Sequence, residues 1–180
     1  PLIKVLGKEI IFYLLDNLKV RKQDQLYIVY NKNLEKFSFE DQLSKYVELN
    51  FLKLNRQTSG PVETIYRITK ILNKNKKKDG LLILDGDTFY RKNIIRMINH
   101  KYHSIFYHQT KIKEPIFSYI NLNNKKVTKI AEKNRISNNA NTGAYFFNNL
   151  QKFNIIAKKK LKVNKKTYVS EIYDELIKEK

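Results

Sequence analysis

Cysteine is absent from all 180 residues of the sequence. Its absence excludes disulfides and zinc sites with thiolate ligands, and it fits a reducing compartment. Long apolar runs are missing as well, since no stretch reaches the roughly 18 residues expected of a membrane span. The first residues, from Pro1 onward, also lack the charged start and apolar core of a secretory signal. We therefore expect a protein without membrane contact that is located in the cytoplasm.

Acidic residues and arginine are scarce, and the net charge is +19. Such a charge favours nucleic-acid binding, because lysine and arginine neutralise phosphates. However, 30 of the 36 basic residues are lysine, and arginine is the better reader of phosphates and base edges. The excess of Lys, Asn, Ile and Tyr is what an AT-rich coding sequence produces. We interpret the lysine clusters at 74–78 and 158–166 as solvated surface, so nucleic acid is a disfavoured partner.

Apolar patterns predict helices and strands in turn along the chain. Helical spacing predicts helices at 8–19, 38–46, from Pro61 onward, 94–98, 149–160 and 169–178. Ser38 is the expected cap of the second of these helices, and a cap by Ser170 is one of two interpretations of the start of the last. Apolar and β-branched runs predict strands at 26–30, 51–54, 81–84, 103–108, 116–122, 127–132 and 142–147. We expect one domain over residues 1–180, of the α/β class, with a Rossmann-like mixed, mostly parallel sheet flanked by helices.

The segment 81–90 carries the most informative motif, because four apolar residues run directly into Asp85, Gly86 and Asp87. The apolar run predicts a buried strand, and the carboxyl end of a strand in an open α/β sheet is where ligands bind. Carboxylates there suit Mg²⁺ or Mn²⁺, hard cations that accompany phosphate-bearing substrates. A polar turn is the competing interpretation, because Asp-Gly is common in turns.

A second polar cluster follows the predicted strand 127–132. Glu132 and Lys133 place an acid beside a base, and a loop of small polar residues then leads through Asn141 to Gly143. A carboxylate can accept hydrogen bonds from sugar hydroxyls, and an ammonium can neutralise a phosphate. Taken alone, the two residues would be an ordinary surface pair.

Four segments in this order resemble the sugar-phosphate nucleotidyltransferases, the family of glucose-1-phosphate thymidylyl- and uridylyltransferases. They are the turn 57–60, the strand end 85–87, the pair Glu132 and Lys133, and the strand 141–147. No segment is highly specific alone, but their order and spacing match. The resemblance implies the nucleotide-diphospho-sugar transferase type of fold. It also implies an enzyme that joins a nucleoside triphosphate to a sugar-1-phosphate, or a similar phosphorylated molecule, and releases pyrophosphate.

The resemblance implies roles for the residues of the first two segments. Gln57 and Gly60 would read the base of the nucleotide. Asp87, in the Gly-Asp motif, would be a catalytic residue that binds Mg²⁺, or alternatively Mn²⁺. Asp85 lies one residue outside the motif and is the second candidate metal ligand.

Roles for the last two segments follow from the same resemblance. Glu132 would bind the sugar, and Lys133 would bind its phosphate and act as a catalytic residue. The main chain around Asn141, ahead of Gly143, would line the sugar pocket.

The chain departs from the family pattern at its start. Family members begin with a strand and a glycine-rich loop carrying an arginine, followed by a lysine shortly before a segment like 1–8. Either the chain is a fragment or catalysis has been lost. Because Pro1 is not an initiating methionine and a first sheet strand is missing, we favour a fragment. We expect it to be incomplete at its C-terminus as well.

Two other functions compete with the nucleotidyltransferase. A glycosyltransferase of the related fold also ends a strand with two aspartates and binds a nucleotide-sugar through Mn²⁺. A module that binds nucleotide-sugars without turnover would explain the absent phosphate loop. The base, the sugar and the oligomeric state are left open by the sequence.

Overall fold

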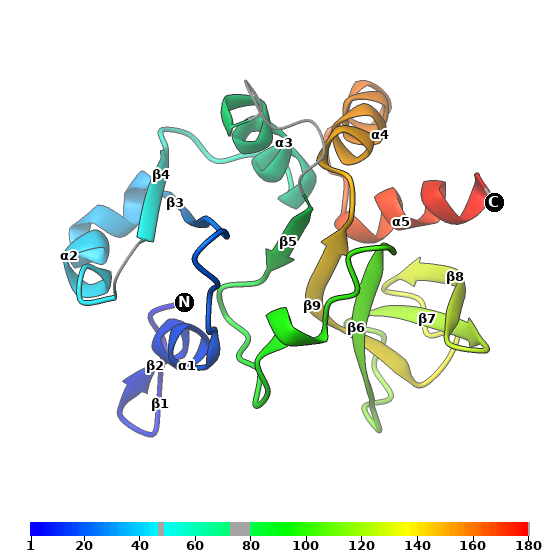
Figure 1. The fold of residues 1–180 in the computed structure, drawn as a ribbon, viewed down its shortest axis with the longest axis horizontal. Coiled ribbons are helices and arrows are strands. Elements are labelled where there is room, and N and C mark those ends of the chain that lie inside the picture. Colours follow the sequence, from blue (N-terminus) through cyan, green and yellow to red (C-terminus); the bar gives the residue numbers. More distant parts are fainter. Residues whose placement is uncertain (47–48, 73–79, 180) are drawn as a thin grey trace. The chain divides into compact units, whose positions relative to one another are not determined.

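The computed structural model describes residues 1–46, 49–72 and 80–179 (Figure 1). The chain divides into two compact units. The first comprises Pro1–Thr58 and Gly86–Ile98, and the second comprises Ser59–Asp85 and Asn99–Lys180. One crossing between the units falls inside the Asp-Gly-Asp motif, so Asp85 belongs to the second unit and Asp87 to the first.

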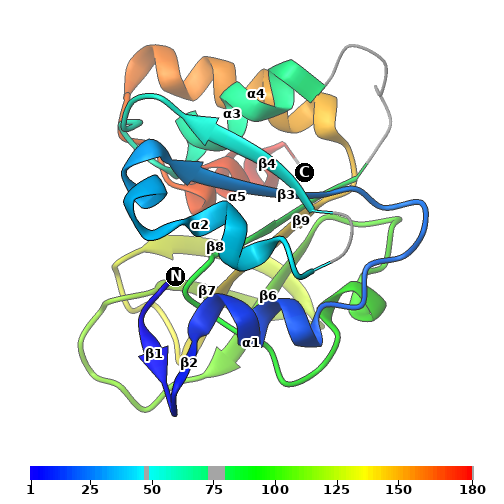
Figure 2. The same ribbon diagram turned by 90° about the vertical axis from the view of Figure 1, so that its left-hand side faces the viewer.

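The first unit contains a parallel pair of strands, β3 (Leu26–Asn31) and β4 (Leu49–Leu54), which lie side by side (Figure 2). Its other elements are β1 (Lys4–Val5), β2 (Lys8–Glu9), α1 (Ile10–Asn17), the 3-10 helix η1 (Lys32–Phe37), α2 (Phe39–Leu43) and the 3-10 helix η2 (Ile94–Met97). The apolar periodicity of α1 is satisfied, because the residues it buries are Ile11, Leu14 and Leu15.

The start of α2 differs from the prediction that Ser38 caps this helix with its side chain. Ser38 has a left-handed backbone, with φ of 50°, and its side chain makes no capping hydrogen bond. A capping serine needs an extended backbone. Because η1 ends at Phe37 and α2 begins at Phe39, Ser38 has to turn the chain between two helices and leaves that conformation.

Among its described residues, the second unit has a five-stranded sheet and three helices. The strands are β5 (Leu81–Leu84), β6 (Ser104–Gln109), β7 (Ser118–Asn123), β8 (Lys126–Glu132) and β9 (Asn139–Phe147). Strand β9 pairs with β5, β6 and β7, and β7 pairs with β8, always antiparallel. The helices are α3 (Pro61–Leu72), α4 (Leu150–Val163) and α5 (Val169–Lys178).

Aromatic side chains fix α5 against β9 in the core of the second unit. The ring centroid of Phe147 lies 4.7 Å from that of Tyr173 and 4.9 Å from that of Phe153. The Tyr173 hydroxyl lies 2.7 Å from the backbone oxygen of Ser104 and 2.5 Å from that of Phe146. Burial raises the pKa of Tyr173 well above its usual value, so this hydroxyl stays protonated and donates. Helix α5 is therefore held at Tyr173 in a defined place beside the sheet.

The predicted α/β class is confirmed, but the expected mixed, mostly parallel sheet needs correction, because none of the described sheets combines parallel and antiparallel pairs. Among the described pairs, only β3 and β4 run parallel, and β5 runs antiparallel to β9. The reason is that β6, β7, β8 and β9 follow one another without an α-helix between them, and strands joined in this way pair antiparallel. Strand β5, predicted to be buried, is half-buried along its length.

Most predicted elements are found close to their expected positions. The hairpin of β7 and β8 is confirmed, and β9 begins three residues before the expected Thr142. The short hairpin of β1 and β2 and the helix η1 were not predicted. The lysine cluster at 74–78 lies outside the described residues. Within the residues that the structure describes, no helix has the length and apolar character needed to cross a membrane.

Candidate active site

Glu132 is the last residue of β8, and two serines bind its carboxylate. Ser118, its partner across the β7–β8 hairpin, donates to Oε2 at 2.5 Å. Ser170, in the first turn of α5, donates to the same oxygen at 2.7 Å. Both serines are buried, whereas Glu132 is half-buried. Residues of two other elements, β7 and α5, therefore hold this carboxylate of β8 in place.

Lys133 follows Glu132 with a strained backbone. Its φ is 48°, a left-handed conformation that costs a residue other than glycine about 1–2 kcal/mol. The Lys133 N–H donates to the backbone oxygen of Phe117 at 3.0 Å, and Nζ lies 5.6 Å from the ring centroid of Tyr168. Lys133 is exposed, so its ammonium is accessible to a ligand. Strain of this kind clusters at binding and catalytic sites.

Asp85 leaves β5 in close contact with Gly143 of β9. The Asp85 N–H donates to the Gly143 oxygen at 3.1 Å, and a Cβ at position 143 would lie 2.3 Å from Asp85 Oδ2. Gly143 also has a φ of 76°, and its N–H donates to Oδ1 of the buried Asn141 at 2.6 Å. Only glycine allows both this backbone and this approach. Asn141 and Gly143 thus shape a turn in β9 that accommodates the Asp85 carboxylate.

Strand β9 connects this turn to the glutamate. Tyr145 lies two residues after Gly143, so both positions face the same side of the sheet. The Tyr145 hydroxyl lies 3.3 Å from Ser118 Oγ, which donates to Glu132. Tyr145 also packs against Tyr173 of α5, with ring centroids 5.5 Å apart. Tyr145 and Glu132 therefore lie on the face of the sheet that α5 covers, and Asp85 contacts the turn of β9 two residues before Tyr145.

Asp87 lies in the first unit and is exposed. Its neighbours pack against α1: a Cβ at Gly86 would lie 3.9 Å from Ile11, and the rings of Phe89 and Tyr13 have centroids 5.5 Å apart. These contacts anchor the segment 86–89 to a helix. The Asp87 carboxylate is left accessible to solvent and to a cation.

Gln57 and Gly60 fall in different units. Gln57 is exposed in the first unit. In the second unit a Cβ at Gly60 would lie 3.2 Å from the backbone oxygen of Thr167, and the N–H of Val62 donates to the same oxygen at 3.3 Å. Gly60 therefore lets the start of α3 pack against the segment before α5, a structural role besides any contact with a base.

The Glu63 carboxylate stabilises the turn that precedes α3 by accepting hydrogen bonds from Ser59. Both the hydroxyl and the N–H of Ser59 donate to Glu63, at 2.6 and 2.7 Å, and Arg67 forms an ion pair with Glu63 at 2.7 Å. The hydrogen bonds from Ser59, with a smaller contribution from Arg67, lower the pKa of Glu63. The carboxylate therefore stabilises the turn in its ionised form.

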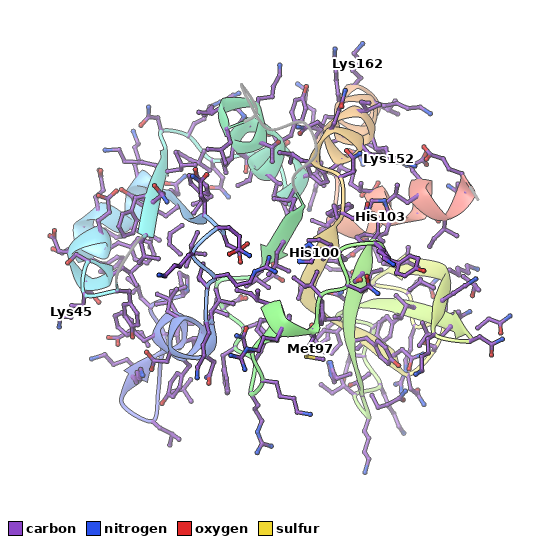
Figure 3. The ribbon with its side chains drawn as sticks, viewed as in Figure 1. Lys45, Met97, His100, His103, Lys152 and Lys162 are labelled. Atoms are coloured by element: carbon purple, nitrogen blue, oxygen red, sulfur yellow. The ribbon has the colours of Figure 1, made fainter. Side chains whose placement is uncertain are left out.

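Each of the three histidines packs against an aromatic ring, and Figure 3 labels two of them, His100 and His103. The pairs, with their centroid distances, are His100 and Phe146 at 5.2 Å, His103 and Phe147 at 6.0 Å, and His108 and Phe117 at 5.6 Å. Among residues 1–46, 49–72 and 80–179, no three His, Cys, Asp or Glu side chains gather into a metal site. A cation bound at Asp85 or Asp87 would therefore need further oxygen ligands from phosphates and water. This kind of ligand set suits Mg²⁺.

The sequence as a whole decides the family, because the family model described as nucleotidyl transferase matches residues 1–180. The chain belongs to the nucleotidyl transferase family. The predicted family and the predicted class of enzyme, a nucleotidyltransferase, are confirmed. A comparison with the curated proteins gives no match.

Solved nucleotidyl transferase structures share the fold of this chain. The nucleoside-diphosphate-sugar pyrophosphorylase of Vibrio cholerae RC9 superposes with a TM-score of 0.78 at 16% identity, over 99% of this chain and 79% of that one. A Bacillus anthracis protein assigned as a glucose-1-phosphate thymidylyltransferase gives 0.74 at 18% identity, over 99% and 74%. The inositol-1-phosphate CTP transferase of T. maritima gives 0.75 at 10% identity, over 99% and 72%. At these identities the likeness shows the fold alone.

The second unit of this nucleotidyl transferase carries most of the predicted site residues. They are Asp85, Glu132, Lys133, Asn141 and Gly143, connected through β9 and its partners, and Gly60 at the start of α3. Asp87 and Gln57 belong to the first unit. The binding roles of these residues stay predictions.

Three residues that contact the Glu132–Lys133 pair were not predicted: Ser118, Ser170 and Tyr168. The prediction that Ser170 caps α5 is wrong, because the helix already begins at Val169 and the Ser170 hydroxyl donates to Glu132. The N–H of Tyr168 is satisfied by Glu171 Oε1 at 2.8 Å instead. Since α5 and β8 are far apart in sequence, local sequence patterns carry no signal for this contact.

Proposed function

We propose that this protein transfers a nucleotidyl group from a nucleoside triphosphate to a sugar-1-phosphate, or a similar phosphorylated small molecule. Membership of the nucleotidyl transferase family supports the reaction class. The observation that supports a sugar phosphate as the second substrate is the residue pair at the end of β8. There the carboxylate of Glu132, held by two serines, directly precedes the exposed ammonium of Lys133. A carboxylate suits sugar hydroxyls, and an ammonium suits the attached phosphate.

The reaction is a substitution at phosphorus. An oxygen of the sugar-1-phosphate forms a bond to the α-phosphorus of the nucleoside triphosphate. The bond from that phosphorus to the bridging oxygen breaks, and pyrophosphate leaves with the electron pair. Little covalent chemistry is asked of the protein, so positioning and charge neutralisation carry the rate.

The chain's own residues would bind and orient the two substrates. Lys133 neutralises the attacking phosphate, and Glu132 accepts a hydrogen bond from a sugar hydroxyl. The backbone around Asn141 and Gly143 lines the sugar pocket, where their turn makes room for Asp85. Each of these groups belongs to the second unit.

Asp87, with Asp85 as the second candidate, would hold a Mg²⁺ or Mn²⁺ ion. The donors fit a hard cation, because both side chains are exposed carboxylates. When bound, the ion would supply positive charge to the phosphate oxygens. Substrate phosphates and water would complete its ligands, as is usual for Mg²⁺.

Gln57 and Gly60 would read the base. Gln57 is exposed and carries both donor and acceptor groups, as base recognition requires. The structural neighbours include a protein named as a thymidylyltransferase and one named as a CTP transferase, so pyrimidine nucleotides are the first to test. We place the reaction in the cytoplasm, because the chain has no cysteine to form disulfides and nucleotide substrates are made inside cells.

The test measures pyrophosphate release by the purified protein with glucose-1-phosphate and each of dTTP, UTP and CTP, in the presence of Mg²⁺. We expect release that depends on both substrates and stops when a chelator is added. Omitting the sugar phosphate is the control for simple triphosphate hydrolysis. Release of a nucleoside diphosphate from a nucleotide-sugar would contradict the proposal and indicate a glycosyltransferase. Binding of nucleotide-sugars without turnover would indicate a non-catalytic module.

A further inference from the structure

One oxygen of the Glu132 carboxylate receives both serine hydrogen bonds. Ser118 and Ser170 donate to Oε2, at 2.5 and 2.7 Å. Ser118 and Ser170 are 8% and 2% exposed, so their hydroxyls are largely shielded from bulk water. Two donors on the same oxygen restrict the rotation of the carboxylate about its last bond.

The hydrogen bond from Ser118 to Glu132 continues through Tyr145 into the core of the second unit. A hydroxyl has a single proton, and that of Ser118 is donated to Glu132. The Tyr145 hydroxyl, 3.3 Å from Ser118 Oγ, must therefore be the donor of that contact. Tyr145 is buried and packs against Tyr173, which anchors α5 to the sheet. The position of the glutamate is thus set by β7, β9 and α5 together.

The second oxygen of the carboxylate is used differently. None of the residues described by the structure donates a hydrogen bond to Glu132 Oε1. Glu132 is half-buried, and the exposed Lys133 follows it. A ligand bound by Lys133 would therefore lie near a Glu132 carboxylate with a single orientation, in which Oε1 is the oxygen left to accept a hydrogen bond.

We propose that Ser118 and Ser170 are positioning residues that hold Glu132 so that Oε1 accepts a hydroxyl of the phosphorylated substrate. The proposal rests on the proposed function and extends it: the substrate must carry a free hydroxyl near its phosphate, as a sugar or another polyol phosphate does. Ser118 and Ser170 do not touch the substrate. They act through Glu132, because they reduce the number of orientations that its carboxylate samples before the substrate binds.

Kinetics of the variants S118A and S170A test this role. Each is expected to raise KM for glucose-1-phosphate about tenfold, since one charge-assisted hydrogen bond is lost. KM for the nucleoside triphosphate and kcat should change less than about threefold, because the nucleotide does not depend on Glu132. S170T, which keeps the hydroxyl, should restore KM even if the added methyl group lowers stability.

A double-mutant cycle separates positioning from general damage. In the background E132A, which removes the acceptor, S170A should cause no further rise in KM, because its effect passes through Glu132. T69V is the matched control: Thr69 is 2% exposed and donates its hydroxyl to Asn154 at 2.5 Å, between α3 and α4. Its loss should lower stability and leave KM unchanged. Wild-type KM in both S118A and S170A, or additive effects in E132A, would overturn the proposal.

A crystallographic readout is independent of turnover. In crystals of the protein, Glu132 should occupy one conformer, and in the double variant S118A/S170A it should occupy more than one. If no pyrophosphate is formed by the wild type, the proposed function fails, and the conformers of Glu132 still decide the positioning role. A single unchanged Glu132 conformer in the double variant would refute it.

Discussion

The two strand ends that carry the acidic site residues are built in opposite ways. At the end of β8, Glu132 is bound by two buried serines, and Lys133 is held in a strained conformation. After the end of β5, Asp87 is exposed on a segment whose neighbouring residues, Gly86 and Phe89, contact α1. The protein organises the first site itself, whereas a cation and its phosphate ligands would organise the second.

This contrast predicts that substitutions at the two strand ends will differ in how much they change activity and how much they change stability. A side chain that touches little in the protein can be changed without loss of stability. A braced or strained side chain affects folding as well as function. The following variants test this difference, from the largest expected effect to the smallest.

Replacing Asp87 by Asn should abolish turnover and leave the fold intact. An amide is a much weaker ligand for a hard cation, so kcat/KM should fall by about a thousandfold or more. The melting temperature should match that of the wild type, because Asp87 is exposed. Pyrophosphate release and thermal unfolding measure the two effects. D41N, at an exposed aspartate of α2, is the control, and turnover near the wild-type rate in D87N would remove Asp87 from the site.

Replacing Lys133 by Asn should lower activity and raise stability. Loss of the cation should reduce kcat/KM about a hundredfold, as for other groups that neutralise phosphate charge. Asn tolerates the left-handed backbone, so the free energy of unfolding should rise by roughly 1 kcal/mol. K125N is the matched control, since Lys125 has a φ of 64° in the β7–β8 turn. It should gain similar stability in denaturant unfolding at unchanged activity, and equal activity losses in both variants would argue against a phosphate role for Lys133.

Replacing Gly143 by Ala should destabilise the end of β5. The left-handed backbone costs about 1–2 kcal/mol and the close contact with Asp85 about as much again. Rotating Asp85 does not relieve the contact, because its Cβ would lie 3.0 Å from the new methyl group. G7A is the control: Gly7 has a φ of 80° and open space around it, so only the backbone cost applies. Equal losses in urea unfolding of G143A and G7A would show that Asp85 does not crowd Gly143.

Replacing Glu63 by Gln should have the smallest effect, and one that depends on pH. The folded-state pKa of Glu63 is lowered below its ordinary 4.5, so its stabilisation is present above that value and is lost as pH falls through the folded-state pKa. E63Q should therefore be less stable than the wild type at pH 7, with a difference that shrinks below about pH 4.5. Unfolding measured from pH 3 to 7 checks this, with the exposed Glu114 changed to Gln as control. A constant difference would assign the effect to packing rather than ionisation.

Patterns within single elements were sufficient for much of the fold. The periodicity of α1 and α3, the apolar run of β5 and the polar turn between β7 and β8 each specify an element locally, because side-chain burial follows a fixed period. Ser38 shows the limit: its type suits a helix cap, but its place between two helices requires another conformation. Strand direction was also missed, since it depends on which distant strand β9 joins.

The amino-acid sequence was enough to establish the family, the α/β class and the candidate residues, because these depend on residue types in a fixed order. The residues that surround Glu132 could not be predicted from residue types and their order. A β-bulge between Asn121 and Leu122 shifts the hairpin register by one residue and places Ser118 opposite Glu132. A one-residue shift turns every later side chain to the other face. Together with the docking of α5, which brings Ser170 from 38 residues away, this packing determines how the carboxylate is held.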